Sequence, residues 1–150
     1  MRRINIIYAG NMKEDYFRQA TQEYIKRLGG AFKIDNTEIK EESSLEKEAN
    51  KILDKLDRLG RVYKIVLDRE GTRLPSEKFA ELLYSERAQN AQSVAFIIGS
   101  SHGLSERVKS AADFRLSFSD MTFPHSLFRV MLMEQIYRAY MIENGRSYHK

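Results

Sequence analysis

Short apolar runs alternate with longer amphipathic segments along the whole chain, and this alternation leaves few folds open. The most apolar runs are Ile4–Tyr8, Val62–Leu67 and Val94–Ile98, and two less regular ones cover Phe32–Ile39 and Phe114–Phe118. We interpret all five as strands. A strand that is apolar at nearly every position is buried on both faces, which is typical of a parallel sheet covered by helices. The predicted fold class is α/β, with a mainly parallel sheet flanked by helices.

The first predicted helix covers Met12–Leu28 and follows Asn11, a residue type that caps helix N-termini. Gly29 is the expected end of this helix, because glycine commonly follows the last helical turn. Tyr16 and Leu28 fall in the same helical row, and we expect both on the buried face.

The middle of the chain predicts two more helices and one turn. Ser43–Glu46 has the pattern of a capping box, in which the Ser hydroxyl and the Glu carboxylate satisfy free backbone donors, and it opens a helix over Leu45–Leu59. Gly60 ends that helix. A turn at Asp68–Gly71 then leads towards a helix over Ser76–Arg87.

Length and composition indicate one domain over residues 1–150, with 42% hydrophobic residues to build its own core. The absence of cysteine excludes disulfides, Cys-based zinc sites and thiol nucleophiles. The N-terminal sequence has no signal-peptide pattern, and no apolar run approaches membrane-spanning length, so we expect a cytoplasmic protein. A net charge of +4 permits a polyanionic partner such as RNA without requiring one.

Three loops follow strands of the predicted parallel sheet, after Leu67, Ile98 and Phe118. Ligands of such sheets usually bind at the carboxyl ends of the strands. The loop Gly99–Gly103 precedes a short helix capped by Ser105, and its glycines would let backbone amides approach a ligand. Taken alone, the motif favours the simpler interpretation, a tight strand-to-helix turn. Neither a phosphate loop nor GxGxxG follows any strand, which argues against a kinase, a nucleotidase or a Rossmann methyltransferase.

The last predicted helix, Ser126–Ile142, is apolar around more than one face. A helix that only covers a sheet needs one apolar stripe. The excess predicts a second partner, most simply the same helix of another subunit. Glu134 and Arg138 are spaced as a helix-surface ion pair. Arg129 is a charge within the most apolar turn, and we expect it to reach a carboxylate, an anion or the subunit boundary.

Two of the three histidines flank this helix. His125 follows Pro124 at the helix start, where a packing or capping role is the simplest interpretation. His149 lies in a basic, aromatic tail with Arg146, Tyr148 and Lys150. Such tails are often disordered, yet Tyr and His can stack on bases while Arg and Lys contact phosphates. The histidines have no metal-ligand spacing, so we predict no metal.

These pieces together resemble the ribosomal large-subunit RNA methyltransferase H family. The resemblance is carried by IIGSSHGLSE at Ile97–Glu106, by LSFSDMTFPHSLFRVMLMEQIYRAY at Leu116–Tyr140 and by the terminal SYHK. It covers essentially the whole chain, and the combination of TFPH, YRA and YHK is highly specific.

The resemblance implies a SPOUT methyltransferase with a trefoil knot near the C-terminus, a topology that general folding rules disfavour. It also implies a homodimer, S-adenosylmethionine as cofactor, and methylation at N3 of a pseudouridine in 23S ribosomal RNA within the assembled ribosome. Two alternatives stay open. One is a non-catalytic RNA- or ribosome-binding α/β module of the same fold, and the other is a SPOUT enzyme for a different RNA position.

Site residues follow from the resemblance position by position. It implies cofactor contacts from the three loops at Leu67, Gly99, Phe118, Ser119, Asp120, Met121, Thr122 and Phe123. His125, Arg129 and His149 become the catalytic candidates, and Arg146, Tyr148 and Lys150 the RNA-binding ones. One departure stands out, because the family usually has IGGPxG where this chain has Ser100, Ser101 and His102. We expect the side chain of Ser100 to narrow the approach to the cofactor.

Overall fold

Five parallel strands form the sheet in the computed structural model, which describes residues 2–150. In chain order the strands are β1 (Arg2–Ala9), β2 (Phe32–Ile39), β3 (Val62–Arg73), β4 (Ser93–Ile98) and β5 (Phe114–Ser117). Their order in the sheet is β2-β1-β4-β3-β5, and every neighbouring pair is parallel. The predicted fold class is therefore confirmed. The knot implied by the family resemblance stays a prediction.

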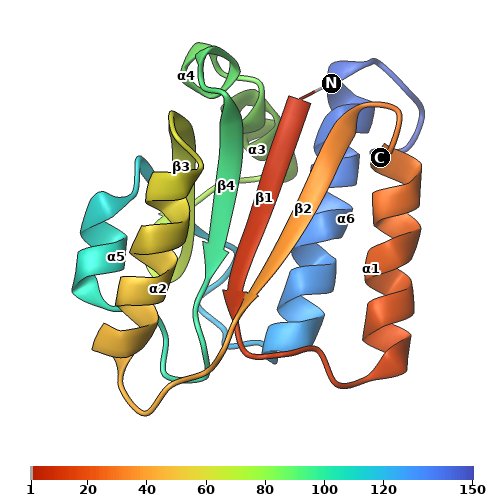
Figure 1. The fold of residues 1–150 in the computed structure, drawn as a ribbon. Helices are drawn as coiled ribbons and strands as arrows, with labels where there is room; N and C mark the ends of the chain where they lie inside the picture. Colours follow the sequence, from red (N-terminus) through yellow and green to blue (C-terminus); the bar gives the residue numbers. More distant parts are fainter. Residues whose placement is uncertain (1) are drawn as a thin grey trace.

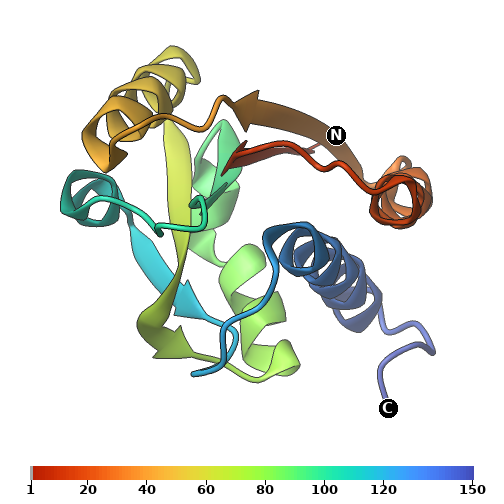
Figure 2. The same cartoon turned by 90° about the horizontal axis from the view of Figure 1, so that it is seen from below.

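Helices cover both faces of the sheet (Figures 1 and 2). The elements α1 (Asp15–Leu28), α3 (Ser76–Leu83) and α6 (His125–Glu143) pack on one face, whereas α2 (Leu45–Arg58) and α5 (Glu106–Ala111) pack on the other. The short α4 (Glu86–Asn90) lies at the edge where the strands begin. All strand ends, and the loops that follow them, therefore meet at the opposite edge, at the bottom of Figure 1.

Alternating strand residues build two separate cores. In β1, Ile6 and Tyr8 face the core under α1, α3 and α6, while Ile7 faces the core under α2 and α5. In β4, Phe96 and Ile97 divide in the same way, and neither is exposed. Side chains of a strand alternate between faces, so a strand covered on both sides must be apolar throughout. This requirement explains the continuous apolar runs in the sequence.

The predicted start of the first helix is wrong by several residues. Helix α1 begins at Asp15 after Glu14, and Asn11 does not cap it. Met12 is only 2% exposed and accepts a hydrogen bond at Sδ from the Thr21 hydroxyl, so it anchors an extended connection instead of starting the helix. The prediction that Tyr16 lies on the buried face of this helix is also wrong, because Tyr16 is 66% exposed. Leu28 is buried as expected.

Two further boundaries differ from prediction because local contacts compete with the regular element. The helix predicted over residues 76–87 is split into α3 and α4, since the Ser85 hydroxyl accepts a hydrogen bond from Ala88 N–H and starts a new helix. At the second helix the predicted capping box does not form: Ser44 is the N-cap, and its hydroxyl accepts a hydrogen bond from Lys47 N–H, one residue after the spacing from Ser43 to Glu46. The reciprocal Glu46 contact is replaced by an ion pair with Arg107.

The predicted turn after Leu67 is an irregularity inside a longer strand. Strand β3 continues to Arg73, and both Leu67 and Thr72 are registered with Leu116 of β5. Gly71 permits this return, because a Cβ atom there would lie 2.6 Å from the carbonyl oxygen of Arg115. The four residues from 68 to 71 thus bulge out of the pairing, and Asp68 among them lines the cavity formed by the loops at this edge.

Candidate functional site

The three loops singled out in the sequence enclose one cavity. Its volume is ≈ 770 Å³, which is within the range of small-molecule sites. Seven of the eight residues implied as cofactor contacts line it, namely Leu67, Gly99, Phe118, Ser119, Met121, Thr122 and Phe123. The eighth, Asp120, does not line the cavity and pairs with Arg73 instead.

Residues Gly99–Gly103 fold tightly on themselves. A Cβ atom at Gly99 would lie 2.4 Å from the carbonyl oxygen of Gly103, so only glycine fits there. Gly103 has a φ of 82° and donates its N–H to the Ser100 carbonyl oxygen over 2.8 Å. Both glycines are therefore required by the turn itself. The same compact turn presents its outer backbone to the cavity.

The Ser100 side chain is held by a buried hydrogen bond to the helix layer behind the loop. Its hydroxyl donates to Glu48 Oε1 over 2.9 Å, and the two residues are 4% and 3% exposed. The other oxygen of Glu48 accepts the N–H of Glu42 over 2.9 Å. The extra side chain at this position is thus engaged with α2, which ties the glycine loop to the connection before that helix.

One wall of the cavity carries a compact charge cluster. The Asp68 carboxylate is 6% exposed and lies 2.9 Å from Arg115 and 3.7 Å from Lys109. Burial acts to raise the pKa of Asp68, but the hydrogen bond from Glu70 N–H and the two nearby cations outweigh it, and the pKa falls below its ordinary value. A fixed negative charge therefore stands beside the apolar floor formed by Leu67 and Leu116.

A second cavity, of ≈ 690 Å³, adjoins the first. It is bounded by the connections after β1 and β2 and by the start of α6, and it shares Ser101, Pro124 and His125 with the first cavity. His125 is the first residue of α6 after Pro124. Arg129, one turn later, lines the second cavity. Of the three catalytic candidates, His125 therefore lies where the two cavities meet and Arg129 lines only the second cavity.

The C-terminal tail folds back on its own chain. Tyr148 donates its hydroxyl to Glu134 over 2.9 Å, and His149 Nε2 lies 2.6 Å from Glu77 Oε1 of α3. The predicted pair of Glu134 and Arg138 forms at 2.6 Å beneath this tail. His149 lines neither cavity of the same chain, so the structure does not bring it to His125.

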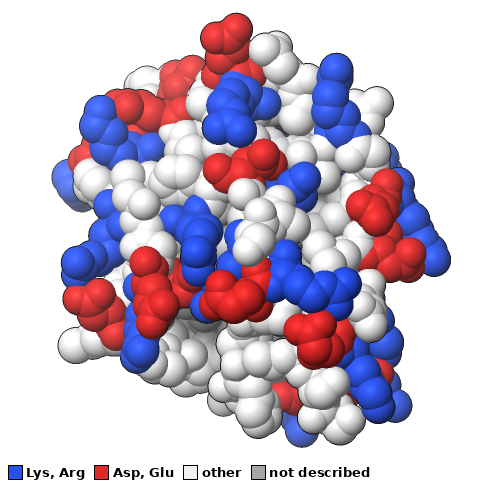
Figure 3. Space-filling model, turned by 90° about the vertical axis from the view of Figure 1, so that its left-hand side faces the viewer, with Lys and Arg blue, Asp and Glu red and all other residues white. Residues whose placement is uncertain are grey.

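The remaining RNA-binding candidates also belong to this end of the molecule. The Arg146 guanidinium lies over the ring of Tyr140, 5.5 Å from its centroid. Elsewhere the surface is mixed in charge. On the side that carries α2 and α5, Figure 3 shows acidic and basic side chains interspersed, in keeping with pairs such as Arg58 with Asp54. An RNA surface is thus better sought on the side of the cavities and the tail.

Residues 2–150 contain neither a membrane-spanning helix nor a cluster of metal-ligating side chains. Within them, no helix is long and apolar enough to cross a bilayer. The same part of the chain contains no group of three or more His, Asp or Glu side chains placed to hold a metal ion.

Sequence reasoning missed the side chains that contact Arg129 and Ser100, and of these only Glu38 lines the second cavity. Tyr8 and Glu38 were assigned only to strands, and Glu48 only to a helix. Each lies at the loop edge of the sheet, but nothing in its local pattern indicates a contact with Arg129 or Ser100. A polar residue at the end of a parallel strand, such as Glu38, was the one available signal.

Comparison with known proteins places this geometry in a class. Residues 2–149 match the family model described as predicted SPOUT methyltransferase. Among solved structures, a probable methylase family protein from Haemophilus influenzae superposes with a TM-score of 0.57 at 11% identity, over 98% of this chain and 70% of that one. A probable methyltransferase from Bordetella pertussis gives 0.52 at 15% identity, over 92% and 94%. These likenesses concern the fold, and with the family match they define a SPOUT methyltransferase.

Sequence relatives narrow the class. The ribosomal RNA large subunit methyltransferase H of Caldicellulosiruptor bescii is 48% identical over 156 residues, covering 98% of this chain and 99% of the relative. The protein of the same name from Streptococcus gordonii is 39% identical over 160 residues, covering 99% of each. The chain belongs to the ribosomal RNA large subunit methyltransferase H family.

Proposed function

We propose that this protein transfers the methyl group of S-adenosylmethionine to N3 of a pseudouridine in 23S ribosomal RNA, on the assembled ribosome in the cytoplasm. Family membership makes the chain a ribosomal RNA methyltransferase that uses S-adenosylmethionine. The base, the atom and the assembled state of the ribosome are the proposed part. The observation that carries the proposal is the pair of adjoining cavities, which gives a methyl donor and an acceptor base separate places with one shared wall.

The first cavity fits the cofactor in size and lining. Leu67, Leu116 and Phe118 offer an apolar surface for the adenine ring, and the backbone of Gly99–Gly103 offers polar groups beside it. The hydroxyl of Ser100 is engaged with Glu48, so it does not compete for the ligand. The Asp68 carboxylate and the Lys109 ammonium in the same wall match the opposite charges of an amino-acid group.

When bound, the sulfonium supplies an already activated methyl group. The chain's own residues then have to align the acceptor and exclude water. His125 lies on the wall shared by both cavities, where it can accept or pass on the N3 proton of the base. His149 of a partner subunit remains the second candidate, because the tail does not reach the site of its own chain.

We also propose that the enzyme is a homodimer. Val130 and Met131 of α6 are only half-buried and line an apolar groove of ≈ 510 Å³ beside β5. Leu127 and Met121 are exposed by 37% and 73%. Exposed and half-buried apolar side chains of this kind at one end of a helix are typical of a subunit contact. A stable monomer in analytical ultracentrifugation would contradict this part of the proposal.

The test uses ribosomes from cells that lack the protein. Incubation with purified enzyme and S-adenosylmethionine, followed by mass mapping of the 23S RNA, should show one new methyl group at N3 of a pseudouridine. A methyl group at a different nucleotide would support a SPOUT enzyme with another target. Calorimetry with S-adenosylmethionine separates the other alternative, since a non-catalytic RNA-binding module would not bind the cofactor.

A further inference from the structure

Arg129 is a buried cation whose hydrogen-bonding capacity is unused. It is 6% exposed, and its guanidinium lies over the Tyr8 ring, with Cζ 3.1 Å from the ring centroid. Within residues 2–150 it makes no hydrogen bond to protein, and its nearest carboxylate oxygen, Oε1 of Glu38, is 3.9 Å from Nη2. That distance is too long for a hydrogen bond. A guanidinium has five N–H donors. No Arg129 nitrogen is among the fully buried unpaired atoms of residues 2–150, so these donors keep access to the cavity that the residue lines.

The groups around Arg129 do not satisfy it. The Tyr8 hydroxyl donates to Glu38 over 3.0 Å, so this carboxylate is already engaged. Arg18 of α1 adds a second positive charge nearby, and burial lowers the pKa of Arg129. Burial also raises the pKa of Tyr8 to about 12, which keeps the phenol neutral and its ring available for stacking. Other charged or titratable residues around the cavity are Lys13, Glu14, Lys40, Glu41 and His125.

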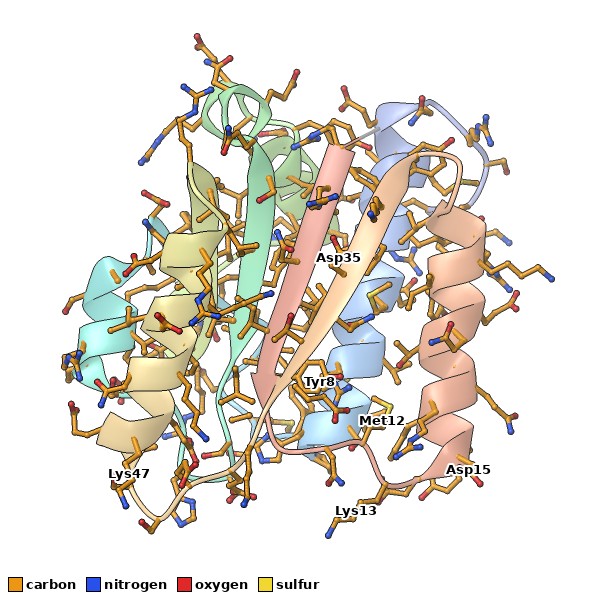
Figure 4. The ribbon with its side chains drawn as sticks, in the orientation of Figure 1. Tyr8, Met12, Lys13, Asp15, Asp35 and Lys47 are labelled. Carbon is orange, nitrogen blue, oxygen red and sulfur yellow. The ribbon has the colours of Figure 1, made fainter. Side chains whose placement is uncertain are left out.

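The unused donors belong to the wall of the second cavity. Figure 4 shows Tyr8 at the end of β1 beside the first turns of α6, with Lys13 projecting outward from the connection after β1. Phe17 of α1 adds an aromatic surface to the same cavity. The cavity thus combines a buried donor, an aromatic ring and lysines nearer solvent. These are the elements with which proteins hold an unstacked nucleotide through its base edge, its base face and its phosphate.

We propose that the second cavity receives the acceptor base, a pyrimidine with an N–H between two carbonyl groups, and that Arg129 donates hydrogen bonds to a carbonyl oxygen of that base. The inference rests on the proposed function and deepens it. In this proposal Arg129 binds the base, and the lysines nearer solvent, Lys13 and Lys40, bind the phosphate. Both cavities meet at Ser101, Pro124 and His125, so a base held on Arg129 can direct its N–H edge towards the cofactor cavity.

The chemistry explains why a buried cation is useful there. The N3 proton leaves first, through His125 to water, and the resulting anion is delocalised over N3 and the two carbonyl oxygens. N3 then forms a bond to the methyl carbon of the cofactor, the carbon–sulfur bond breaks, and its electron pair stays on sulfur. Negative charge therefore appears on the base before transfer. A fixed guanidinium stabilises that charge more than it stabilises the neutral base, and it lowers the barrier.

Direct binding is tested with small probes on the intact protein. The side-chain Nε–H signals of ¹⁵N-labelled arginines are followed while uridine 5′-monophosphate or ribose 5-phosphate is added. We expect the nucleotide to shift the Arg129 signal and the sugar phosphate to leave it in place. Equal shifts with both probes would show a phosphate site and overturn the proposal, as would the absence of any shift with the nucleotide at saturation of the cofactor.

Methylation kinetics of Arg129 variants provide the second test of the proposal. Arg129→Gln should lower single-turnover methylation of unmethylated ribosomes about 100-fold, as expected for loss of one charge-stabilising donor. Its affinity for S-adenosylmethionine should not change. The rate profile should move to higher pH, because the base loses the cation that favours its deprotonation, and Arg129→Lys should restore part of the shift. The control is Arg58→Gln on α2, far from both cavities.

The outcomes separate this inference from the proposed function. If the wild-type enzyme methylates no pseudouridine, the proposed function is wrong. Wild-type activity together with an unchanged pH profile in Arg129→Gln would remove only the role of Arg129. If both Arg129 variants fail to fold, the probe titration on the wild-type protein still decides the question.

Discussion

Ser100 and Glu48 form a hydrogen bond of 2.9 Å between two side chains that are each more than nine-tenths buried. Ser100 belongs to the glycine loop of the cofactor cavity, and Glu48 lies in the first turn of α2. Because Glu48 also accepts the N–H of Glu42, one carboxylate holds two loops at the edge of the sheet. A residue that departs from the family pattern therefore has a defined partner in this chain.

Removing the Ser100 hydroxyl should destabilise the protein. Ser100→Ala or Ser100→Gly leaves a buried carboxylate oxygen without its donor, at a cost of about 1–3 kcal/mol in the free energy of unfolding. Urea denaturation measures the change. The matched control is the neighbour Ser101→Ala, whose hydroxyl contacts Glu41 at the exposed surface, and a change within about 0.5 kcal/mol is expected there. Equal effects at both positions would contradict the account.

Acid should weaken the wall of the cofactor cavity. The pKa of Asp68 lies below its ordinary value of 3.8, so its contribution to stability is present above that value and is lost as the pH falls through the lower, folded-state pKa. Asp68→Asn should be less stable than the wild type at neutral pH, and the difference should shrink below about pH 4. Thermal melting between pH 7 and pH 3 measures it. A constant difference across that range would show that the charge is unimportant.

Alkali should act through buried tyrosines. Burial raises the pKa of Tyr84 to about 12 against the opposing effect of Arg2, so folding favours the neutral phenol. The unfolded chain releases this proton near pH 10 and the folded chain releases it later, so stability falls as the pH rises between the two values. Tyr84→Phe should make the loss of stability above pH 10 shallower. Tyr16→Phe, at a residue 66% exposed, provides the control.

Deletion of Tyr148–Lys150 should abolish methylation and leave the affinity for S-adenosylmethionine unchanged. The tail lines neither cavity of its own chain, so its loss should not disturb the cofactor site. Its tyrosine, histidine and lysine are proposed to act on RNA or in the site of a partner subunit. Turnover on ribosomes, with calorimetry as the control, measures both effects. Unchanged turnover would show that the tail has no part in the reaction.

Much of the fold was predictable because its strands are buried on both faces. Burial on both faces explains the apolar runs around Ile6, Val66 and Phe96. These runs were enough to predict the parallel sheet and the edge at which its loops meet. Boundaries that depend on distant partners were not predictable. The continuation of β3 past Leu67 requires the close approach of Gly71 to Arg115, which no local pattern of the sequence contains.

The candidate site also contains residues that could be predicted from the sequence and residues that could not. Residues with a local signal, such as the glycines of the turn at Gly99 and Gly103, were found from the sequence. Arg129 attracted notice as a charge in an apolar turn, but its stacking on Tyr8 joins the last helix to the first strand and could be seen only in the structure. Glu48 gave no signal, because a carboxylate in the first turn of a helix is ordinary.

The most direct test of the central claim is methyl transfer in vitro to ribosomes from cells that lack this protein, followed by mass mapping of the 23S RNA. The account predicts one added methyl group, dependent on S-adenosylmethionine and located at N3 of a pseudouridine. Enzyme that binds the cofactor but adds no methyl group to these ribosomes, or adds it to another nucleotide, would contradict it.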